Sequence, residues 1–220
     1  MKLVFVCRRR ENLSRTSYVE RLLAGHVPLA LRHHPTMRRY VVNVVEDETA
    51  AHDSIGELWF DSLDDYRERL YDSPEGERII AADVRTFLGA AEAYLTEERI
   101  HRAPPRGTLG ERTAGVKLLV GIERAEGLSP TAFESAWHER HVPIVLACAE
   151  VAGYATSRVD QTLSPGAPPF DGFAELWFAS PADFVQHVAR AREPNEPMAK
   201  DVAGLVRRAT ALRVAEFVQR

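Results

Sequence analysis

Several features that mark common classes of protein are missing from this chain of 220 residues. No apolar run approaches the roughly 20 residues that span a bilayer. The basic residues 8–10 follow the apolar residues 2–7, which reverses the order of a secretory signal. The net charge is −4, and neither half carries a basic stripe that would attract nucleic acid. We therefore expect no membrane partner and no nucleic-acid partner.

Cysteine is also scarce. Cys7 and Cys148 stand in different halves and in apolar settings, which predicts two buried thiols in a reducing compartment, the cytoplasm. No G-x-S-x-G elbow, glycine-rich phosphate loop or paired C-x-x-C occurs in the chain. The commonest nucleophile, nucleotide and zinc signatures are therefore missing.

Two pairs of histidines raise the question of a metal site. His33 and His34 are adjacent, and His138 and His141 are three residues apart. Zinc sites need three or four converging ligands, and no matching carboxylate or cysteine cluster accompanies either pair. We therefore expect no metal and no organic cofactor.

One stretch occurs twice in the chain. Residues 133–144 read F-E-S-A-W-H-E-R-H-V-P-I, and residues 18–29 read Y-V-E-R-L-L-A-G-H-V-P-L. An i, i+4, i+8 spacing predicts one helix face in each copy. These faces consist of Phe133, Trp137 and His141 and of Tyr18, Leu22 and His26. The proline two positions after each histidine predicts the helix end, so each histidine is expected at a helix C-terminus, where the dipole favours its protonated form.

Two further motifs recur at nearly the same spacing. Residues 2–5, K-L-V-F, are matched 115 positions later by residues 117–120, K-L-L-V. Residues 55–60, I-G-E-L-W-F, are matched 118 positions later by residues 173–178, F-A-E-L-W-F. Three motifs that recur in the same order at nearly one period indicate an internal duplication.

Each copy has the pattern of a βαββαβ unit. In the first copy the expected strands are residues 2–7, 40–45 and 54–61, and Ser14 and Ser62 are expected to cap the helices that follow. The last strand is less clear in the sequence. Its residues, 90–95, read nearly as well as helix.

The duplication predicts the architecture. Helices on one face of each sheet leave the other face bare, and two such faces can bury each other. We expect an α+β fold in which ferredoxin-like units, residues 1–98 and 116–220, are joined by a linker at residues 99–115 that is rich in proline and glycine.

The motifs W-x-x-x-H-x-P-[LI] and [GA]-E-L-W-F-x-S resemble those of EthD-domain proteins of the dimeric α+β barrel superfamily. Residues 137–144 and 174–180 carry both motifs, and the first copy has Leu22 in place of the tryptophan. The resemblance covers both halves and implies an intramolecular dimeric α+β barrel with a small cavity between sheet and helices in each unit. It also implies chemistry without metal or organic cofactor, whereas more distant relatives bind haem.

His141 and His26 are the first candidate catalytic residues. An imidazole can pass a proton in either direction near neutral pH. The alternative is a structural histidine that caps helix carbonyls and packs against its neighbours, such as Trp137. Because Leu22 replaces the tryptophan in the first copy, we expect His141 to matter more than His26.

Glu175 and Glu57 are further catalytic candidates because each stands among apolar strand residues. A carboxylate that faces the cavity would orient an imidazole or act as a second acid. One that faces the bare side of the sheet would form an interface salt bridge, and we favour this second interpretation because both copies keep the residue. The expected substrate contacts are Trp137, Tyr154, Tyr40, Trp177 and Trp59.

The expected function is that of a cofactor-independent lyase, cyclase or dehydratase, in which histidine moves protons on a small, hydrophobic, carbonyl-containing metabolite of polyketide-like or aromatic type. A cofactor-free monooxygenase and a non-catalytic small-molecule binding protein are the alternatives. The chain is expected to be a monomeric pseudo-dimer or a weak homodimer.

Overall fold

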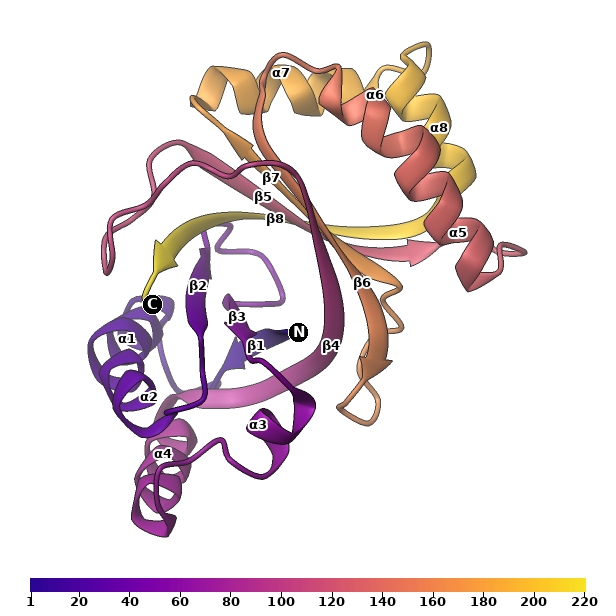
Figure 1. Ribbon diagram of the computed structural model, residues 1–220. Coiled ribbons are helices and arrows are strands. Elements are labelled where there is room, and N and C mark those ends of the chain that lie inside the picture. Colours follow the sequence, from indigo (N-terminus) through magenta and orange to yellow (C-terminus); the bar gives the residue numbers. More distant parts are fainter.

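The computed structural model describes residues 1–220. Its eight strands form one closed antiparallel barrel (Figure 1). The first unit contributes β1 (Lys2–Arg9), β2 (Arg39–Val45), β3 (Ser54–Trp59) and β4 (Leu88–Arg102). The second contributes β5 (Val116–Arg124), β6 (Val151–Thr162), β7 (Gly172–Phe178) and β8 (Val206–Val218). Around the barrel their order is β1-β3-β2-β8-β5-β7-β6-β4.

Each unit has the ferredoxin-like strand order, and the two sheets join through their long last strands. β1 pairs with β3 and β4, and β5 pairs with β7 and β8. The barrel closes where β4 pairs with β6 and β8 pairs with β2. In Figure 1 the long β4 and β8 run from their own sheet to the edge of the other. The expected intramolecular dimeric α+β barrel is confirmed.

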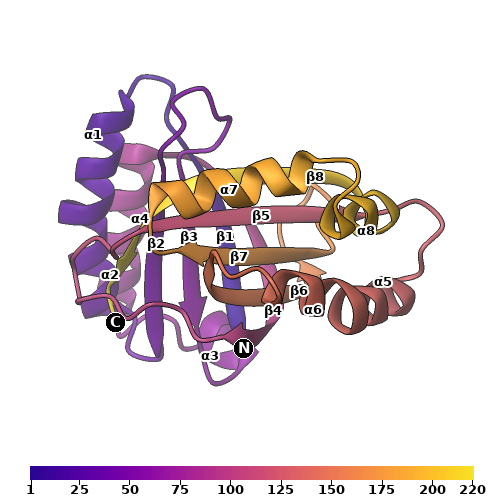
Figure 2. The same ribbon diagram turned by 90° about the horizontal axis from the view of Figure 1, so that it is seen from above.

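The helices lie outside the barrel, against the faces of the two sheets (Figure 2). In the first unit they are α1 (Arg15–Glu20), a π-helical turn (Arg21–His26), α2 (Val27–His33), α3 (Leu63–Arg67) and α4 (Pro74–Phe87). In the second they are α5 (Pro130–Ala136), a π-helical turn (Trp137–His141), α6 (Val142–Leu146), α7 (Pro181–Arg192) and α8 (Pro197–Leu205). No helix is long and apolar enough to cross a membrane.

Serine residues cap the N-termini of helices in both units. Ser14 and Ser62 accept hydrogen bonds from the backbone N–H groups of Ser17 and Asp65, as the sequence predicts. Ser129 and Ser180 do the same at the corresponding positions of the second unit. The local signals that begin these helices were therefore duplicated with the rest of the unit.

The prediction that Pro28 and Pro143 end their helices is wrong. Both helices continue through the proline, because a π-helical turn directly precedes it. The N–H of Val142 donates to Trp137 O, five residues earlier, and such a widened turn relieves the clash between a proline ring and the preceding carbonyls. His26 and His141 therefore lie inside continuous helices, and the expected effect of a helix C-terminus on their pKa does not apply.

The connection between the units is shorter than the sequence suggests. Residues 90–95 form a strand, and this strand, β4, continues to Arg102, four residues into the segment expected as linker. The mostly charged segment Glu97–Arg102 gave no strand signal of its own, but its pairing with β6 holds it extended.

Strand alternation divides the interior into separate cores. On β3, Leu58 packs with the helices of the first unit, whereas Ile55 belongs to the cluster inside the barrel. A third cluster lies between the sheet and helices of the second unit and includes Trp137. Each unit thus has its own helix-facing core, and both share the barrel interior.

Both cysteines are free thiols. Cys148 is buried as expected, but Cys7 is only half-buried. Burial still dominates at the Cys7 thiol and raises its pKa, and the side chain lines the cavity on the helix-facing side of the first sheet.

Candidate active site

Each unit has a cavity between its helices and the outer face of its sheet, as the resemblance implies. The cavity of the second unit has a volume of about 760 Å³, and 17 of its 24 lining residues are hydrophobic. The cavity of the first unit has about 230 Å³, with 16 hydrophobic residues among 20. Known small-molecule pockets span about 300–1,000 Å³, so only the second cavity falls in that range.

The polar groups of the second cavity are few. Charged side chains lie at its exposed rim, and the first unit supplies some of them through the loop between β2 and β3. The rim residues are Glu46, Asp47, Glu48, Arg192 and Arg213. The wall offers two imidazoles, His141 and His187, and the phenol of Tyr154.

His141 forms a dyad with a buried aspartate. Its Nδ1 lies 2.9 Å from Oδ2 of Asp201, which comes from α8 and has a side chain that is 5% exposed. Arg140 contacts the other oxygen of the same carboxylate, so the buried negative charge has a counter-ion. His141 Nε2 has no hydrogen-bond partner in the protein, and the residue lines the cavity.

The environment makes His141 a base at neutral pH. Burial lowers its pKa below the usual value, and the hydrogen bond that His141 Nδ1–H donates to Asp201 offsets this only in part. The imidazole is therefore neutral, with its proton on Nδ1 toward Asp201 and its lone pair on Nε2. Nε2 can accept a proton from a ligand in the cavity, and Asp201 then stabilises the imidazolium.

Tyr154 and Trp137 form the wall beside this dyad. The Tyr154 hydroxyl is buried and has no well-formed hydrogen bond, although the Trp137 indole lies close to it. Burial dominates and raises the pKa of Tyr154, so the hydroxyl keeps its proton. A buried, unpartnered donor is unfavourable, and a ligand oxygen in the cavity would satisfy it.

The first unit has the corresponding dyad in a more crowded place. His26 Nδ1 lies 2.9 Å from Asp83 Oδ2, and burial lowers the pKa of His26 as well. The ring of Phe87 packs 5.2 Å from the His26 ring, whereas the corresponding residue of the second unit is the smaller Leu205. Tyr40 also lines this cavity, as expected for a substrate contact.

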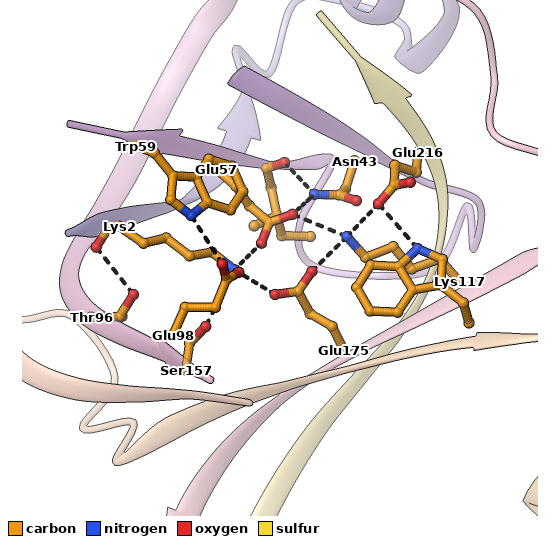
Figure 3. Close-up of polar contacts among 12 residues, drawn as sticks. Lys2, Asn43, Glu57, Trp59, Thr96, Glu98, Lys117, Ser157, Glu175 and Glu216 are labelled. Atoms are coloured by element: carbon orange, nitrogen blue, oxygen red, sulfur yellow. Dashed lines mark hydrogen bonds and ion pairs between the residues drawn. The ribbon is translucent and has the colours of Figure 1, made fainter. Parts of the chain in front are cut away.

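The other predicted site residues lie elsewhere. Glu57, Glu175, Trp59 and Trp177 line neither cavity, because strand alternation points them into the barrel. Figure 3 shows Glu57 and Glu175 beside Lys2 and Lys117. The structure therefore brings His141, Trp137 and Tyr154 together but separates them from the glutamates. The placement corrects the assignment of these four residues to a site shared with the histidines, and it agrees with the alternative of an interface salt bridge.

Inside the barrel the glutamates contact two lysines. The Lys117 ammonium lies 3.0 Å from Glu57, 2.7 Å from Glu175 and 2.8 Å from Glu216. Lys2 likewise contacts Glu57 and Glu175, and its third carboxylate is Glu98. The indole N–H groups of both tryptophans donate to this cluster, to Glu98 from Trp59 and to Glu216 from Trp177.

The charges of this cluster depend on one another. Burial alone would lower the pKa of Lys2 and Lys117, but the carboxylates outweigh it and raise both values, so both lysines are charged. The two lysines also outweigh burial at Glu57 and hold its pKa well below the usual value. Burial and the Glu57 charge raise the pKa of Glu175. The cluster thus ties the two units together by paired charges.

Asp201 and Asp83 were not predicted from the sequence. Each lies about 60 residues after its histidine, so no short motif links the two groups. A signal did exist, because the two aspartates are 118 positions apart, the same spacing as the repeated strand motif. Both precede a valine in the last helix of their unit.

The comparisons with known proteins agree with the fold. The EthD domain matches the chain twice, at residues 10–91 and 125–207. These matches cover more than half of the chain, which therefore belongs to the EthD domain family. No protein of curated function matches the sequence.

Solved structures with the same barrel are distant in sequence. An anthrone oxidase-like protein aligns with a TM-score of 0.68 at 8% identity, over 99% of this chain and 92% of that one. A candidate monooxygenase from Fusobacterium nucleatum aligns with a TM-score of 0.62 at 5% identity, over 100% and 92%. Chlorite dismutase from Candidatus Nitrospira defluvii aligns with a TM-score of 0.54 at 13% identity, over 97% and 90%. At these identities the likeness concerns the fold alone.

Proposed function

We propose that the second unit is a cofactor-independent acid–base site acting on a small, hydrophobic, carbonyl-containing metabolite of polyketide-like or aromatic type. The observation that carries this proposal is the His141–Asp201 dyad in the wall of an apolar cavity of about 760 Å³. A cavity of this size accepts a substrate with several fused rings.

In the proposed reaction His141 Nε2 removes a proton from a carbon next to a carbonyl group. Asp201 holds the imidazole in the tautomer that leaves Nε2 free and stabilises the positive charge that forms. The Tyr154 hydroxyl donates to the enolate oxygen, where negative charge develops. The Trp137 indole provides a flat wall for a planar ring.

The fate of the enolate distinguishes the reaction classes. In a dehydration, the proton on His141 passes to a leaving hydroxyl, which departs as water while a carbon–carbon double bond forms. In a cyclisation, the enolate carbon attacks a second carbonyl of the same molecule, and His141 returns the proton to the new alkoxide. Neither route needs an oxidant, so both suit the lyase, cyclase or dehydratase function.

A cofactor-free monooxygenase is the second candidate. The names of two neighbours favour it, since one is anthrone oxidase-like and another is a candidate monooxygenase. The same first step would produce an enolate that reacts with O₂, so that one oxygen atom is retained as a carbonyl and the other leaves as water with two substrate hydrogens. This route consumes one O₂ for each substrate molecule.

Anthrone, an enolisable tricyclic ketone, is a suitable probe for the shared first step. In D₂O without oxygen, the protein should accelerate exchange of the methylene protons of anthrone, which lie across the central ring from the carbonyl and are made acidic by it through the fused rings. The exchange is followed by NMR in the presence of a metal chelator. His141→Ala should lower the accelerated rate by about 100- to 10,000-fold, and His26→Ala should lower it far less.

The thermal midpoint of each variant separates catalysis from packing. If His141→Ala lowers the midpoint but leaves the rate per folded molecule intact, His141 is structural and the proposed function is wrong. If the wild-type protein binds anthrone but does not accelerate proton exchange, the domain is a binding module for such ligands. Uptake of O₂ in air, measured with an oxygen electrode, would favour the monooxygenase.

A further inference from the structure

A second group of buried side chains lies beside the cavity of the second unit. The Cys148 thiol, the Glu150 carboxylate and the His187 imidazole each place a ligand atom within 4.8 Å of the other two. Cys148 and Glu150 follow α6 in the turn before β6, and His187 lies on α7. All three residues are buried, with exposures of 3%, 6% and 5%.

The polar atoms of this group lack the partners that buried atoms normally have. Both carboxylate oxygens of Glu150 and Nδ1 of His187 are buried without a hydrogen bond. Their nearest polar contacts are 3.5 Å between His187 Nδ1 and Glu150 Oε1 and 3.3 Å between Arg190 Nε and the same oxygen. The Cys148 thiol donates a hydrogen bond to Ile144 O at 3.5 Å, a normal length for sulfur, so the missing partners are those of Glu150 and His187. A buried carboxylate without hydrogen bonds is costly and calls for a missing partner.

The distances suit a shared metal ion. Two nitrogen or oxygen ligands of one tetrahedral Zn²⁺ ion are about 3.4 Å apart, as bond lengths near 2.0–2.1 Å require. The separation of 3.5 Å between His187 Nδ1 and Glu150 Oε1 is close to this value. Thiolate, imidazole and carboxylate are all ligands that zinc accepts.

We infer that Cys148, Glu150 and His187 form a binding site for Zn²⁺ or a similar divalent transition metal, with a fourth position left for water. This inference departs from the sequence-based expectation of no metal, which rested on histidine pairs that the fold does not bring to such a cluster. The proton transfer proposed for His141 does not use the metal. The two proposals can therefore fail independently.

The first unit shows what the same place looks like without a metal. Cys148 corresponds to His33, 115 positions earlier, and Arg190 corresponds to Asp72, 118 positions earlier. His33 Nδ1 lies 3.1 Å from both oxygens of Asp72, so the pair satisfies itself. In the second unit Arg190 is the one competitor for the ligands, and its side chain is 36% exposed and free to turn toward solvent.

Metal binding would fix a wall of the cavity. His187 lines the cavity itself, and α7 also carries Phe184, Val188 and Ala191 of the lining. A metal bound by His187, Cys148 and Glu150 would tie α7 to the turn between α6 and β6. The thermal midpoint should therefore rise when the metal binds.

The test uses the full chain after removal of metal with a chelator. Titration with Zn²⁺ and with Co²⁺ should give one bound ion per chain by calorimetry and elemental analysis. Bound Co²⁺ should show the visible bands of a tetrahedral ion together with a thiolate charge-transfer band. Cys148→Ala, Glu150→Gln and His187→Gln should each weaken binding by at least about 100-fold.

Matched variants make the result specific. Cys7→Ser and His33→Gln should leave binding unchanged, and Arg190→Gln should tighten it several-fold because it removes a positive charge next to a ligand oxygen. Circular dichroism shows whether each ligand variant folds. If one does not fold, the affinity of the Arg190→Gln variant for the metal tests the site instead. Absence of one tight ion in the wild-type protein, or bound Co²⁺ without a thiolate band, would overturn the proposal.

Discussion

The two units are nearly the same where they meet and different where each faces its own cavity. Inside the barrel Lys2 and Lys117 occupy equivalent places, and so do Glu98 and Glu216. In the cavities the dyads are kept, but the surrounding side chains differ. Each lysine contacts glutamates from both units, so a substitution at the interface affects both copies at once. A substitution in one cavity affects only that unit.

The change in the second cavity involves a matched pair of residues. Trp137 replaces Leu22, and Gly172 replaces Ser54, which in the first unit bonds to the Tyr18 hydroxyl at 2.7 Å. A Cβ atom on Gly172 would overlap the Trp137 ring. The larger indole is therefore accommodated by removal of a side chain from the sheet, and the cavity stays open.

The largest effect is expected from variants that disrupt the buried cluster of lysines and glutamates inside the barrel, which both units share. Lys117→Met should lower the free energy of unfolding by about 3–5 kcal/mol, because Glu57, Glu175 and Glu216 lose a buried counter-ion. Lys2→Met should have a similar effect. Chemical denaturation followed by circular dichroism measures both.

The third lysine of the chain serves as control. Lys200 is exposed on α8 and forms no salt bridge, so Lys200→Met should change the free energy of unfolding by less than about 0.5 kcal/mol. The loss in Lys117→Met should shrink as the pH falls, since the uncompensated carboxylates then take up protons. An equal loss for all three lysines would mean that the buried cluster has no special role.

The dyads provide the next comparison. Asp201→Asn should reduce the exchange rate on anthrone on the order of 100-fold, whereas Asp83→Asn should leave it nearly unchanged. The rate of the wild-type protein falls as the pH drops through the lowered pKa of His141, because only neutral His141 accepts a proton. Asp201 raises that pKa, so the acid limb of Asp201→Asn should move to lower pH. A lower rate with an unmoved acid limb would contradict a direct effect on His141.

A smaller effect concerns the matched pair in the cavity. Gly172→Ala should cost about 1–3 kcal/mol because the new methyl group displaces the Trp137 ring. The double variant Gly172→Ala with Trp137→Leu, which imitates the first unit, should recover part of this loss. Thermal and chemical denaturation provide the double-mutant cycle, and strictly additive effects would show that the two residues do not interact.

The smallest expected effect is a loss of stability in mild acid. Burial lowers the pKa of seven of the eight histidines, and for His34 of the first unit to about 4. Below their usual pKa near 6.5, the unfolded chain binds more protons than the folded chain, so stability falls as the pH falls. The thermal midpoint should decrease from pH 7 to pH 5.

His34→Gln tests which unit dominates this response. The second unit has Ala149 at the corresponding position, so the variant removes a difference between the halves. The midpoint of His34→Gln should fall less between pH 7 and pH 5 than that of the wild-type protein. An unchanged slope would show that the remaining histidines account for the effect.

Much of the architecture could be predicted from the sequence, because the signals that specify it are local. Serine caps, strand alternation and helical spacing act over a few residues, and the duplication displayed each signal twice. Helical spacing placed Trp137 and His141 on one face, and the resemblance to EthD-domain proteins implied the cavity that these two residues and Tyr154 line. The end of the helices was misjudged because a π-helical turn before Pro28 or Pro143 leaves no distinct local pattern.

By itself the sequence determined the duplicated βαββαβ pattern, the helix faces and the choice of histidine as the candidate base. The tertiary structure decided which groups lie beside those residues: Asp201 beside His141, the barrel lysines beside Glu57 and Glu175, and His187 beside Cys148 and Glu150. These partners come from segments far apart in the chain, so no local spacing specifies them. Charge and burial are properties of that assembled environment, and the chemistry of each group follows from it.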